Sequence, residues 1–79
     1  MYTRFLTYDL NYGTSDDYQD LYDLIATYDH KQITESTYEI STKEDWQTFK
    51  SKFYKVTHTG DNVKAIVRQE DAMKVWTIR

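Results

Sequence analysis

The chain has 79 residues, contains no cysteine and carries a formal net charge of −3. It is therefore one domain at most, it has no disulfide, thiolate or cysteine-based zinc chemistry, and a reducing cytosol is the compartment that fits best. No stretch is long and apolar enough to cross a membrane, so we expect no membrane partner. Aromatic residues make up 16% of the chain. Because a small core gains stability by association and tyrosine suits an interface, we expect a homodimer.

Charge is unevenly distributed along the chain. Residues 1–45 carry three basic and ten acidic side chains, whereas residues 46–79 carry seven basic and three acidic ones. One interpretation of the second half is a basic surface that contacts phosphate. The other is that two solvated helices differ in sign, and we favour it because the chain has no dense cluster of lysine and arginine.

The first half of the chain predicts a strand and then an amphipathic helix. Tyr2–Asp9 reads as a central strand covered on both faces, because its apolar residues do not alternate cleanly with polar ones. A loop at residues 11–15 follows, and Tyr12 within it is a candidate for an interface or ligand contact. Asp16–Tyr28 reads as a helix with Ser15 as its N-cap. The apolar face of this helix is formed by Tyr18, Leu21, Tyr22, Ile25 and Tyr28.

The second half predicts strands on either side of another helix. Lys31–Ser41 is extended, and a shift in its apolar phase leaves two interpretations open: one bent strand, or two short strands of a hairpin. Thr42 reads as the N-cap of a second helix, with Asp45 at the third helical position. Two strands follow, at Asn62–Arg68 and Met73–Ile78. The core face of the second helix is formed by Trp46, Phe49 and Phe53.

The order of these elements predicts the fold class. A strand and a helix are followed by two strands, a helix and two more strands, and two helices that cross between strands of one sheet indicate an α+β, ferredoxin-like sandwich. We therefore expect a single domain over residues 1–79. It should have an antiparallel sheet, two helices on one face and an extra C-terminal strand.

Asp9 is the candidate functional residue that the pattern itself provides. A carboxylate at the carboxyl-terminal tip of a central strand is a common place for a metal ligand or a catalytic acid. It is also a common place for an Asx turn, whose side chain accepts main-chain N–H groups of the next loop. The residues leave both interpretations open. His30 and His58 read as exposed loop residues outside any metal-ligand spacing.

Four segments, taken together, resemble one protein family. The resemblance is to the short Cas-two-like proteins, which are related to the nuclease-like subunit of the CRISPR adaptation complex and, more distantly, to virulence-associated protein D. It covers nearly the whole chain. The segments are Tyr8-Asp9-Leu10-Asn11, Asp17-Tyr18-Gln19-Asp20-Leu21-Tyr22, Glu35-Ser36-Thr37-Tyr38 and Gly60-Asp61-Asn62-Val63.

The resemblance implies a homodimer in which two sheets face each other and the final strand pairs with the partner's sheet. In that family the acid that closes the first strand, here Asp9, lies near the dimer axis, where two copies hold a divalent cation such as Mg²⁺ or Mn²⁺. Ser36 matches the serine of the second-strand motif. The resemblance therefore implies Asp9 and Ser36 as catalytic residues, with Asp9 as the metal ligand. The implied activity is metal-dependent endonuclease cleavage of RNA or DNA, or a scaffold role without cleavage.

One departure from the family favours a second class of function. The arginine-rich start of the first helix that is usual in the adaptation subunit is replaced here by Asp16, Asp17 and Asp20, which removes expected phosphate contacts. An acidic helix and many tyrosines instead suit a non-enzymatic binder of another protein. Such a binder would be a phage or mobile-element protein that binds a host defence or regulatory protein.

Overall fold

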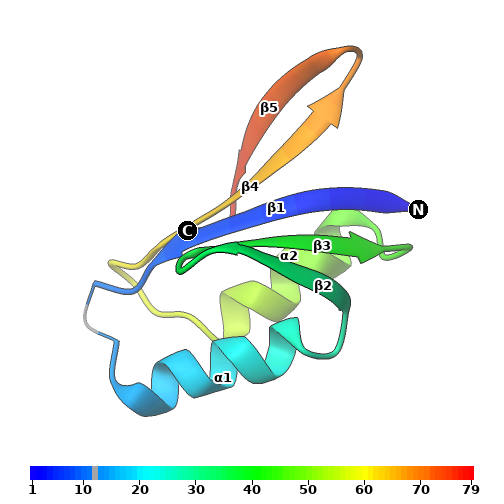
Figure 1. Ribbon diagram of the computed structural model, residues 1–79. Coiled ribbons are helices and arrows are strands. Elements are labelled where there is room, and N and C mark those ends of the chain that lie inside the picture. The colour runs from blue at the N-terminus through cyan, green and yellow to red at the C-terminus, as the bar shows by residue number, and fades with distance from the viewer. Residues whose placement is uncertain (12) are drawn as a thin grey trace.

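The computed structural model describes residues 1–11 and 13–79, so the predicted contact residue Tyr12 lies outside the described residues. Among those residues, neither helix has the length and apolar character needed to cross a membrane. The elements follow the predicted order (Figure 1). The strands are β1 (Tyr2–Asp9), β2 (Asp29–Thr34), β3 (Thr37–Thr42), β4 (Asn62–Gln69) and β5 (Ala72–Thr77), and the helices are α1 (Ser15–Ile25) and α2 (Trp46–Lys55).

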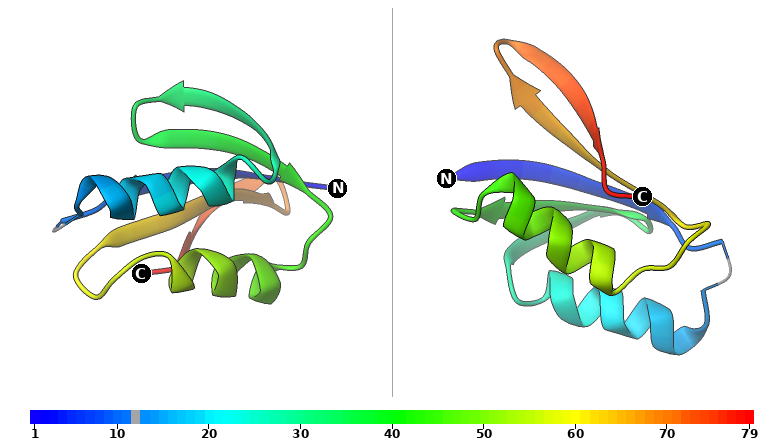
Figure 2. Two further views of the ribbon diagram at one scale, coloured as in Figure 1. Left: turned by 90° about the horizontal axis from the view of Figure 1, so that it is seen from below. Right: turned by 180° about the vertical axis from the view of Figure 1, so that it is seen from behind.

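The five strands form one sheet in the order β2-β3-β1-β4-β5, and every neighbouring pair is antiparallel. Both helices lie on the same side of this sheet (Figure 2). The order β2-β3-β1-β4, with a helix after β1 and another after β3, is a ferredoxin-like sandwich, and β5 extends it by one strand. The predicted α+β fold is therefore confirmed.

β1 is covered on one face only, which corrects the expectation that both of its faces are covered. Arg4, Leu6 and Tyr8 are buried, whereas Phe5 and Thr7, which alternate with them, are only half-buried. The pairing of Leu6 with buried neighbours and the position of the helices place the first set on the helix side. The prediction failed because Phe5 is apolar although it points away from the helices. We call this helix-free side of the sheet the open face.

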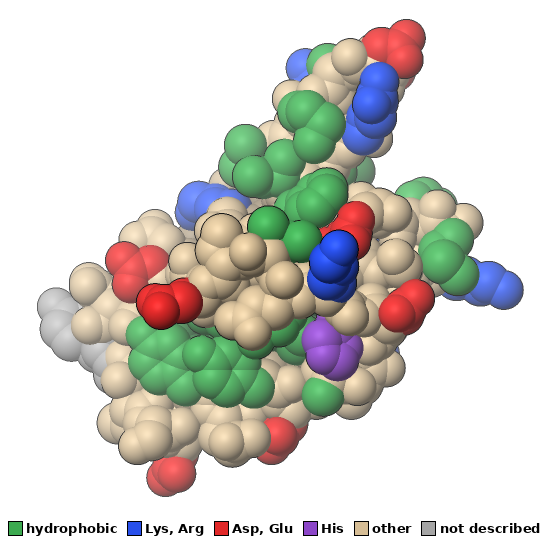
Figure 3. Space-filling view, in the orientation of Figure 1, with side chains coloured by type: hydrophobic (Ala, Val, Ile, Leu, Met, Phe, Trp, Pro, Cys, Tyr) green, Lys and Arg blue, Asp and Glu red, His purple; other side chains and the backbone are tan. Residues whose placement is uncertain are grey.

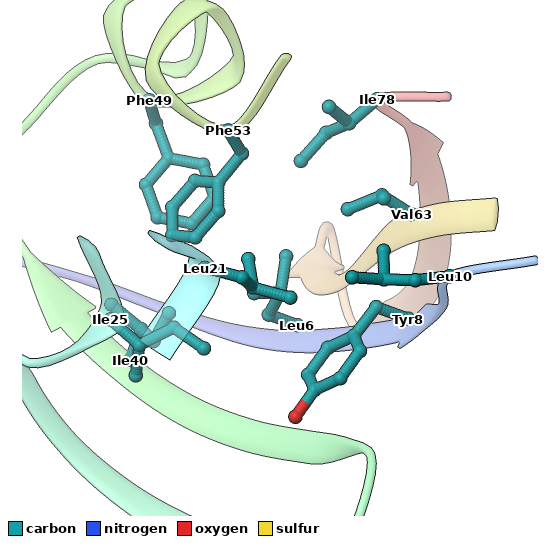
Figure 4. Close-up of a cluster of buried hydrophobic side chains, with 10 residues drawn as sticks. All are labelled: Leu6, Tyr8, Leu10, Leu21, Ile25, Ile40, Phe49, Phe53, Val63 and Ile78. Carbon is teal, nitrogen blue, oxygen red and sulfur yellow. The ribbon is translucent and has the colours of Figure 1, made fainter. Parts of the chain in front are cut away.

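The core lies between the sheet and the helices (Figure 4). Phe49 and Phe53 of α2 are fully buried, and their ring centroids are 4.7 Å apart. Trp46 packs against the same cluster and is partly buried, so the predicted core face of α2 is confirmed. The other members of the buried cluster are Leu6, Tyr8, Leu10, Leu21, Ile25, Ile40, Val63 and Ile78.

Residues 31–41 form a hairpin rather than one bent strand. β2 and β3 pair antiparallel on either side of a turn at Glu35 and Ser36. Their register also shifts between Gln32 and Thr34. Ile33 lies at this irregularity and is exposed, whereas Ile40 is buried, so the phase shift in the sequence marks an apolar residue outside the core.

The N-cap of each helix differs from the predicted residue, by one position in α1 and by three positions in α2. Thr14, not Ser15, is the N-cap of α1, and it forms a capping box with Asp17. Asp45, not Thr42, is the N-cap of α2, because its side chain accepts a hydrogen bond from Thr48 N at 2.8 Å. Thr42 remains in β3, where its pairing with β1 prevents a helical start.

The β4–β5 hairpin rises from the sheet on the side opposite the helices (Figure 1). Its turn residues Glu70 and Asp71 have φ angles of 51° and 64°, the left-handed values that tight hairpin turns require. Pairing between β4 and β1 ends at Val67. Arg68 and Gln69 pair only with β5, so the start of β1 and the end of β4 separate.

Candidate functional site

The two residues that the resemblance singled out line one open pocket. Asp9 is exposed at the carboxyl end of β1, and Ser36 is exposed in the turn between β2 and β3. Both border a pocket of about 710 Å³, together with Asn62 and Lys64 of β4. The fold therefore brings Asp9 and Ser36 together from distant parts of the sequence.

Hydrogen bonds attach the Ser36 turn to β1. The main-chain N–H of Tyr8 donates to the main-chain oxygen of Ser36 at 3.1 Å. The Tyr8 hydroxyl donates to the main-chain oxygen of Glu35 at 3.2 Å. Ser36 N in turn donates to Thr34 Oγ1 at 3.2 Å. These contacts position the turn beside Asp9, so the pocket has a defined wall rather than a free loop.

Tyrosine rings form the helix-side wall of the pocket. Tyr22 meets Tyr8 edge-on with ring centroids 6.3 Å apart, and Tyr8 also stacks at 6.4 Å with Tyr38, which does not line the pocket. Tyr18 continues the wall, with its ring 6.1 Å from that of Tyr22. Burial raises the pKa of Tyr8 well above its usual value, so this phenol stays neutral. The wall provides flat apolar surface beside an acidic opening.

The pocket of a single copy holds no preformed cluster of histidine, cysteine or acidic side chains among the described residues. Within residues 1–11 and 13–79, no group of three or more histidine, cysteine, aspartate or glutamate side chains is placed to hold a metal ion. Mg²⁺ and Mn²⁺ prefer oxygen ligands, and the carboxylate of Asp9 is one such ligand. Mg²⁺ usually binds proteins through one or two carboxylates together with water or substrate oxygens, so a second copy of Asp9 or a substrate phosphate would add to the donors of this pocket.

The acidic residues of α1 do not form a second site. Asp17 accepts hydrogen bonds from the main-chain N–H and the hydroxyl of Thr14, and Asp23 accepts one from Gln19 at 2.7 Å. Asp16 and Asp20 are exposed. These contacts and exposures agree with a solvated helix face. Acidic side chains near its N-terminus interact favourably with the positive end of the helix dipole.

The histidines differ in their surroundings from the prediction of isolated loop residues. His30 is exposed but lies in β2, where its Nδ1 is 2.8 Å from the main-chain oxygen of Tyr28. His58 Nε2 lies 3.1 Å from Asp17 Oδ1, so it contacts the start of α1. Neither histidine lines the Asp9 pocket, so neither is placed to act as a base there.

Asp61 organises the loops next to the pocket, and the sequence analysis did not assign it a role. It is only 7% exposed. Its Oδ1 accepts from Asn11 N at 3.2 Å and its Oδ2 from His58 N at 2.8 Å. The carboxylate thus ties the loop after β1 to the turn after α2. Aspartate is a frequent acceptor of main-chain N–H groups in turns, so the sequence His-Thr-Gly-Asp carries a signal for this role.

Arg4 is a second residue that the sequence analysis missed. It is only 3% exposed, and it lies beneath the start of α2 on the helix side of β1. The signal was available in the sequence, because Arg4 shares its parity with Leu6 and Tyr8, and alternate residues of a strand point to the same face. An arginine on the buried parity of a central strand is unusual.

Comparison of the chain with protein-family models, curated proteins and solved structures finds no match.

Proposed function

We propose that the chain acts as a homodimer with metal-dependent endonuclease activity at Asp9, within the Cas-two-like class. The observation that carries this proposal is the shared pocket of Asp9 and Ser36 at the end of β1. When bound, a divalent cation would polarise a phosphodiester and lower the pKa of a water molecule. Asp9 would hold the cation, and Ser36 and Asn62 would contact the substrate.

The open face supports dimerisation. Phe5 of β1, Ile66 of β4 and Val75 of β5 are cross-strand neighbours, and they form a row on this face. Val75 is 63% exposed, and Met73 beside it is 56% exposed. Figure 3 shows hydrophobic side chains that extend along the protruding hairpin. Burial of such a row against a second copy is favourable at about 25 cal/mol per Å² of apolar surface.

A two-fold axis parallel to β1 fits the charges of the open face. Rotation about this axis would place β3 of one copy over β4 of its partner. Glu39 of β3 would then lie opposite the basic strand β4, which carries Lys64 and Arg68 on the open face. The same rotation would bring Asp9 toward its own copy. The second carboxylate would then add to the donors of one pocket.

A cleavage assay tests the catalytic part. Labelled single- and double-stranded RNA and DNA are incubated with Mg²⁺ or Mn²⁺ and the wild type, Asp9→Asn or Asp20→Asn. Asp20 is the matched control, because it is an exposed aspartate on α1 outside the pocket. We expect cleavage by the wild type and by Asp20→Asn but not by Asp9→Asn. Equal cleavage by all three proteins, or cleavage by none, contradicts the proposal.

Light scattering at micromolar concentration tests the dimer. Val75→Asp should weaken association at least about tenfold, because a charge would enter the apolar row. Tyr54→Asp is the control, since Tyr54 is 49% exposed on α2, on the helix side of the sheet. A monomeric wild type, or equal mass for both variants, refutes the open-face dimer.

A non-enzymatic protein binder is the second candidate. The exposed apolar side chains of Met73 and Val75 on the open face favour it, because such side chains suit contact with another protein. In this case the row of Phe5, Ile66 and Val75 would contact a different protein, such as a host defence or regulatory protein. A wild type that is monomeric and does not cleave would favour the binder over the nuclease.

A further inference from the structure

A second pocket lies where the start of β1 and the end of β4 separate. Its volume is about 420 Å³. Tyr2 and Thr3 pair only with β3, and pairing with β4 begins at Arg4. The start of α2 closes one side and β5 closes another. The pocket is thus formed by four elements, and it lies apart from the Asp9 site.

A buried arginine lines this pocket. Arg4 is 3% exposed, and its Nη1 is buried with no hydrogen-bond partner among the described residues. Its guanidinium carbon lies 4.7 Å from the ring centroid of Phe49 and 4.8 Å from that of Tyr2. Aromatic rings compensate a buried cation only in part. A charge in such a position is costly unless an anion pairs with it.

The nearest carboxylates do not fill this role. Glu44 accepts hydrogen bonds from the Tyr28 hydroxyl and from Lys52. Asp45 accepts one from Thr48 as the N-cap of α2. Both carboxylates attract Arg4 electrostatically. The hydrogen bonds that they accept, however, come from Tyr28, Lys52 and Thr48 and not from Arg4. The planar fork of a guanidinium best matches a carboxylate or phosphate.

The remaining lining combines apolar and aromatic side chains with the polar side chains of Thr3, Asp45, Arg68 and Gln69. The Asp45 carboxylate repels a doubly charged phosphate more strongly than a singly charged carboxylate, and this difference selects between the two anions. Trp46 and Trp76 both line the pocket, and their rings meet edge-on with centroids 4.8 Å apart. Val67 and Met1 add apolar surface. A phosphate would bring a higher charge into this partly apolar setting, whereas a carboxylate attached to an apolar group would pair with Arg4 and cover the rings.

We propose that this pocket binds an apolar carboxylate, whose carboxylate group pairs with Arg4 and whose apolar body packs on Trp46 and Trp76. Two sources share this chemistry: a small free acid and the C-terminus of a peptide with an apolar last residue. Tyr2 is the side chain that would move to admit the ligand. It is 54% exposed, whereas Phe49, the other ring close to the guanidinium, is fully buried.

Tryptophan fluorescence gives a direct measurement, because the only two tryptophans of the chain line the pocket. The probes are phenylacetate and a short tryptophan-free peptide ending in a free leucine, each compared with its amide up to about 1 mM. We expect saturable changes with the acids and at least about tenfold weaker responses with the amides. A response to phenylacetate identifies a small acid as sufficient, and a response to the peptide acid alone identifies a C-terminus. Equal titrations for acids and amides, or no response to either acid, overturn the proposal.

Variants localise the response. Arg4→Met should weaken acid binding at least about tenfold. Lys31→Met is the control, because it removes one positive charge from β2, the opposite edge of the sheet. If both variants bind the acids equally well, Arg4 is not the anchor and the proposal fails. Should Arg4→Met unfold, as circular dichroism would show, the comparison of acid and amide on the wild type still decides.

Discussion

Asp17 Oδ1 lies 3.1 Å from His58 Nε2, and this contact joins the start of α1 to the loop after α2. The other carboxylate oxygen of Asp17 accepts the main-chain N–H of Thr14, which completes the capping box of α1. Asp17 therefore has two structural roles: it caps the start of α1 and it contacts the loop after α2. The acidity of α1 is thus not by itself a sign of a cation site or of a surface that binds a basic partner.

Acid should destabilise the fold through its helix caps. Hydrogen bonding to the Thr14 main chain, and then to His58, lowers the pKa of Asp17, and hydrogen bonds from Thr48 lower that of Asp45. A carboxylate whose pKa is lower in the folded state contributes stability above its unfolded pKa. That contribution is lost as pH falls through the folded pKa. We therefore expect the free energy of unfolding to decrease below about pH 4.

Urea unfolding at several pH values measures this dependence. The double variant Asp17→Asn and Asp45→Asn should be less stable at neutral pH, and its stability should change less with pH below about pH 4. Asp16→Asn and Asp20→Asn together provide the control, since both carboxylates are exposed on α1. A double cap variant with the same pH dependence as the wild type would contradict the assignment.

Thr14→Ala should lower the free energy of unfolding by about 1 kcal/mol. The hydroxyl accepts the Asp17 main-chain N–H at 3.3 Å, and alanine cannot replace that acceptor. Ser15→Ala is the matched control, because Ser15 is the first residue of α1 and not its cap. Chemical denaturation of both variants distinguishes the two positions. A larger loss for Ser15→Ala would restore the cap that the sequence predicted.

Asp61→Ala should destabilise the fold more than a cap variant does. The substitution leaves the main-chain N–H groups of Asn11 and His58 without their acceptor. The cost of leaving a buried donor unsatisfied is about 1–3 kcal/mol. Asn62→Ala is the control, because Asn62 is exposed at the next position. Equal unfolding midpoints for the two variants would show that water replaces the carboxylate without cost.

The sequence was sufficient for the features that depend on periodicity. Phe49 and Phe53 repeat at helical spacing and are buried, and the order of elements determined the sandwich. The sequence was insufficient where two neighbouring residues, or two kinds of secondary structure, compete for the same position. Ser15 and Thr14 are both good N-cap residues, and only the chain direction after Gly13 selects Thr14. In the same way, Thr42 is a capping residue by type but is held in β3 by its partner Tyr2.

The candidate site was predictable only in part, because some of its residues have a local signal and others come together only in the fold. Asp9 was identifiable from its place at a strand end, whereas its proximity to Ser36 depends on a hairpin that the sequence left open. Arg4 was missed because arginine is usually exposed, although its parity with Leu6 and Tyr8 placed it on the buried face. The rings of Phe49 and Trp46 that surround its guanidinium come from α2, and the strand pattern alone does not identify these distant partners.

Arg4→Met should leave the free energy of unfolding unchanged or raise it by about 1 kcal/mol. Methionine keeps an unbranched apolar chain beside Phe49 and Tyr2 but removes a buried charge whose Nη1 has no partner among the described residues. Replacement of a buried ion by an apolar residue of similar volume is often neutral or stabilising. Arg4→Ala, which leaves a cavity, should instead be destabilising by about 2 kcal/mol or more.

Thermal and urea unfolding of the two Arg4 variants separate a stabilising role from a binding role. If Arg4 holds the fold together, methionine and alanine should both be strongly destabilising, because both remove the charge. If Arg4 is retained for a ligand, only alanine should be strongly destabilising, and methionine should lose the response to apolar carboxylates without losing stability. A loss of about 3 kcal/mol or more with methionine would assign Arg4 to stability, since that is the scale for breaking a buried ionic contact.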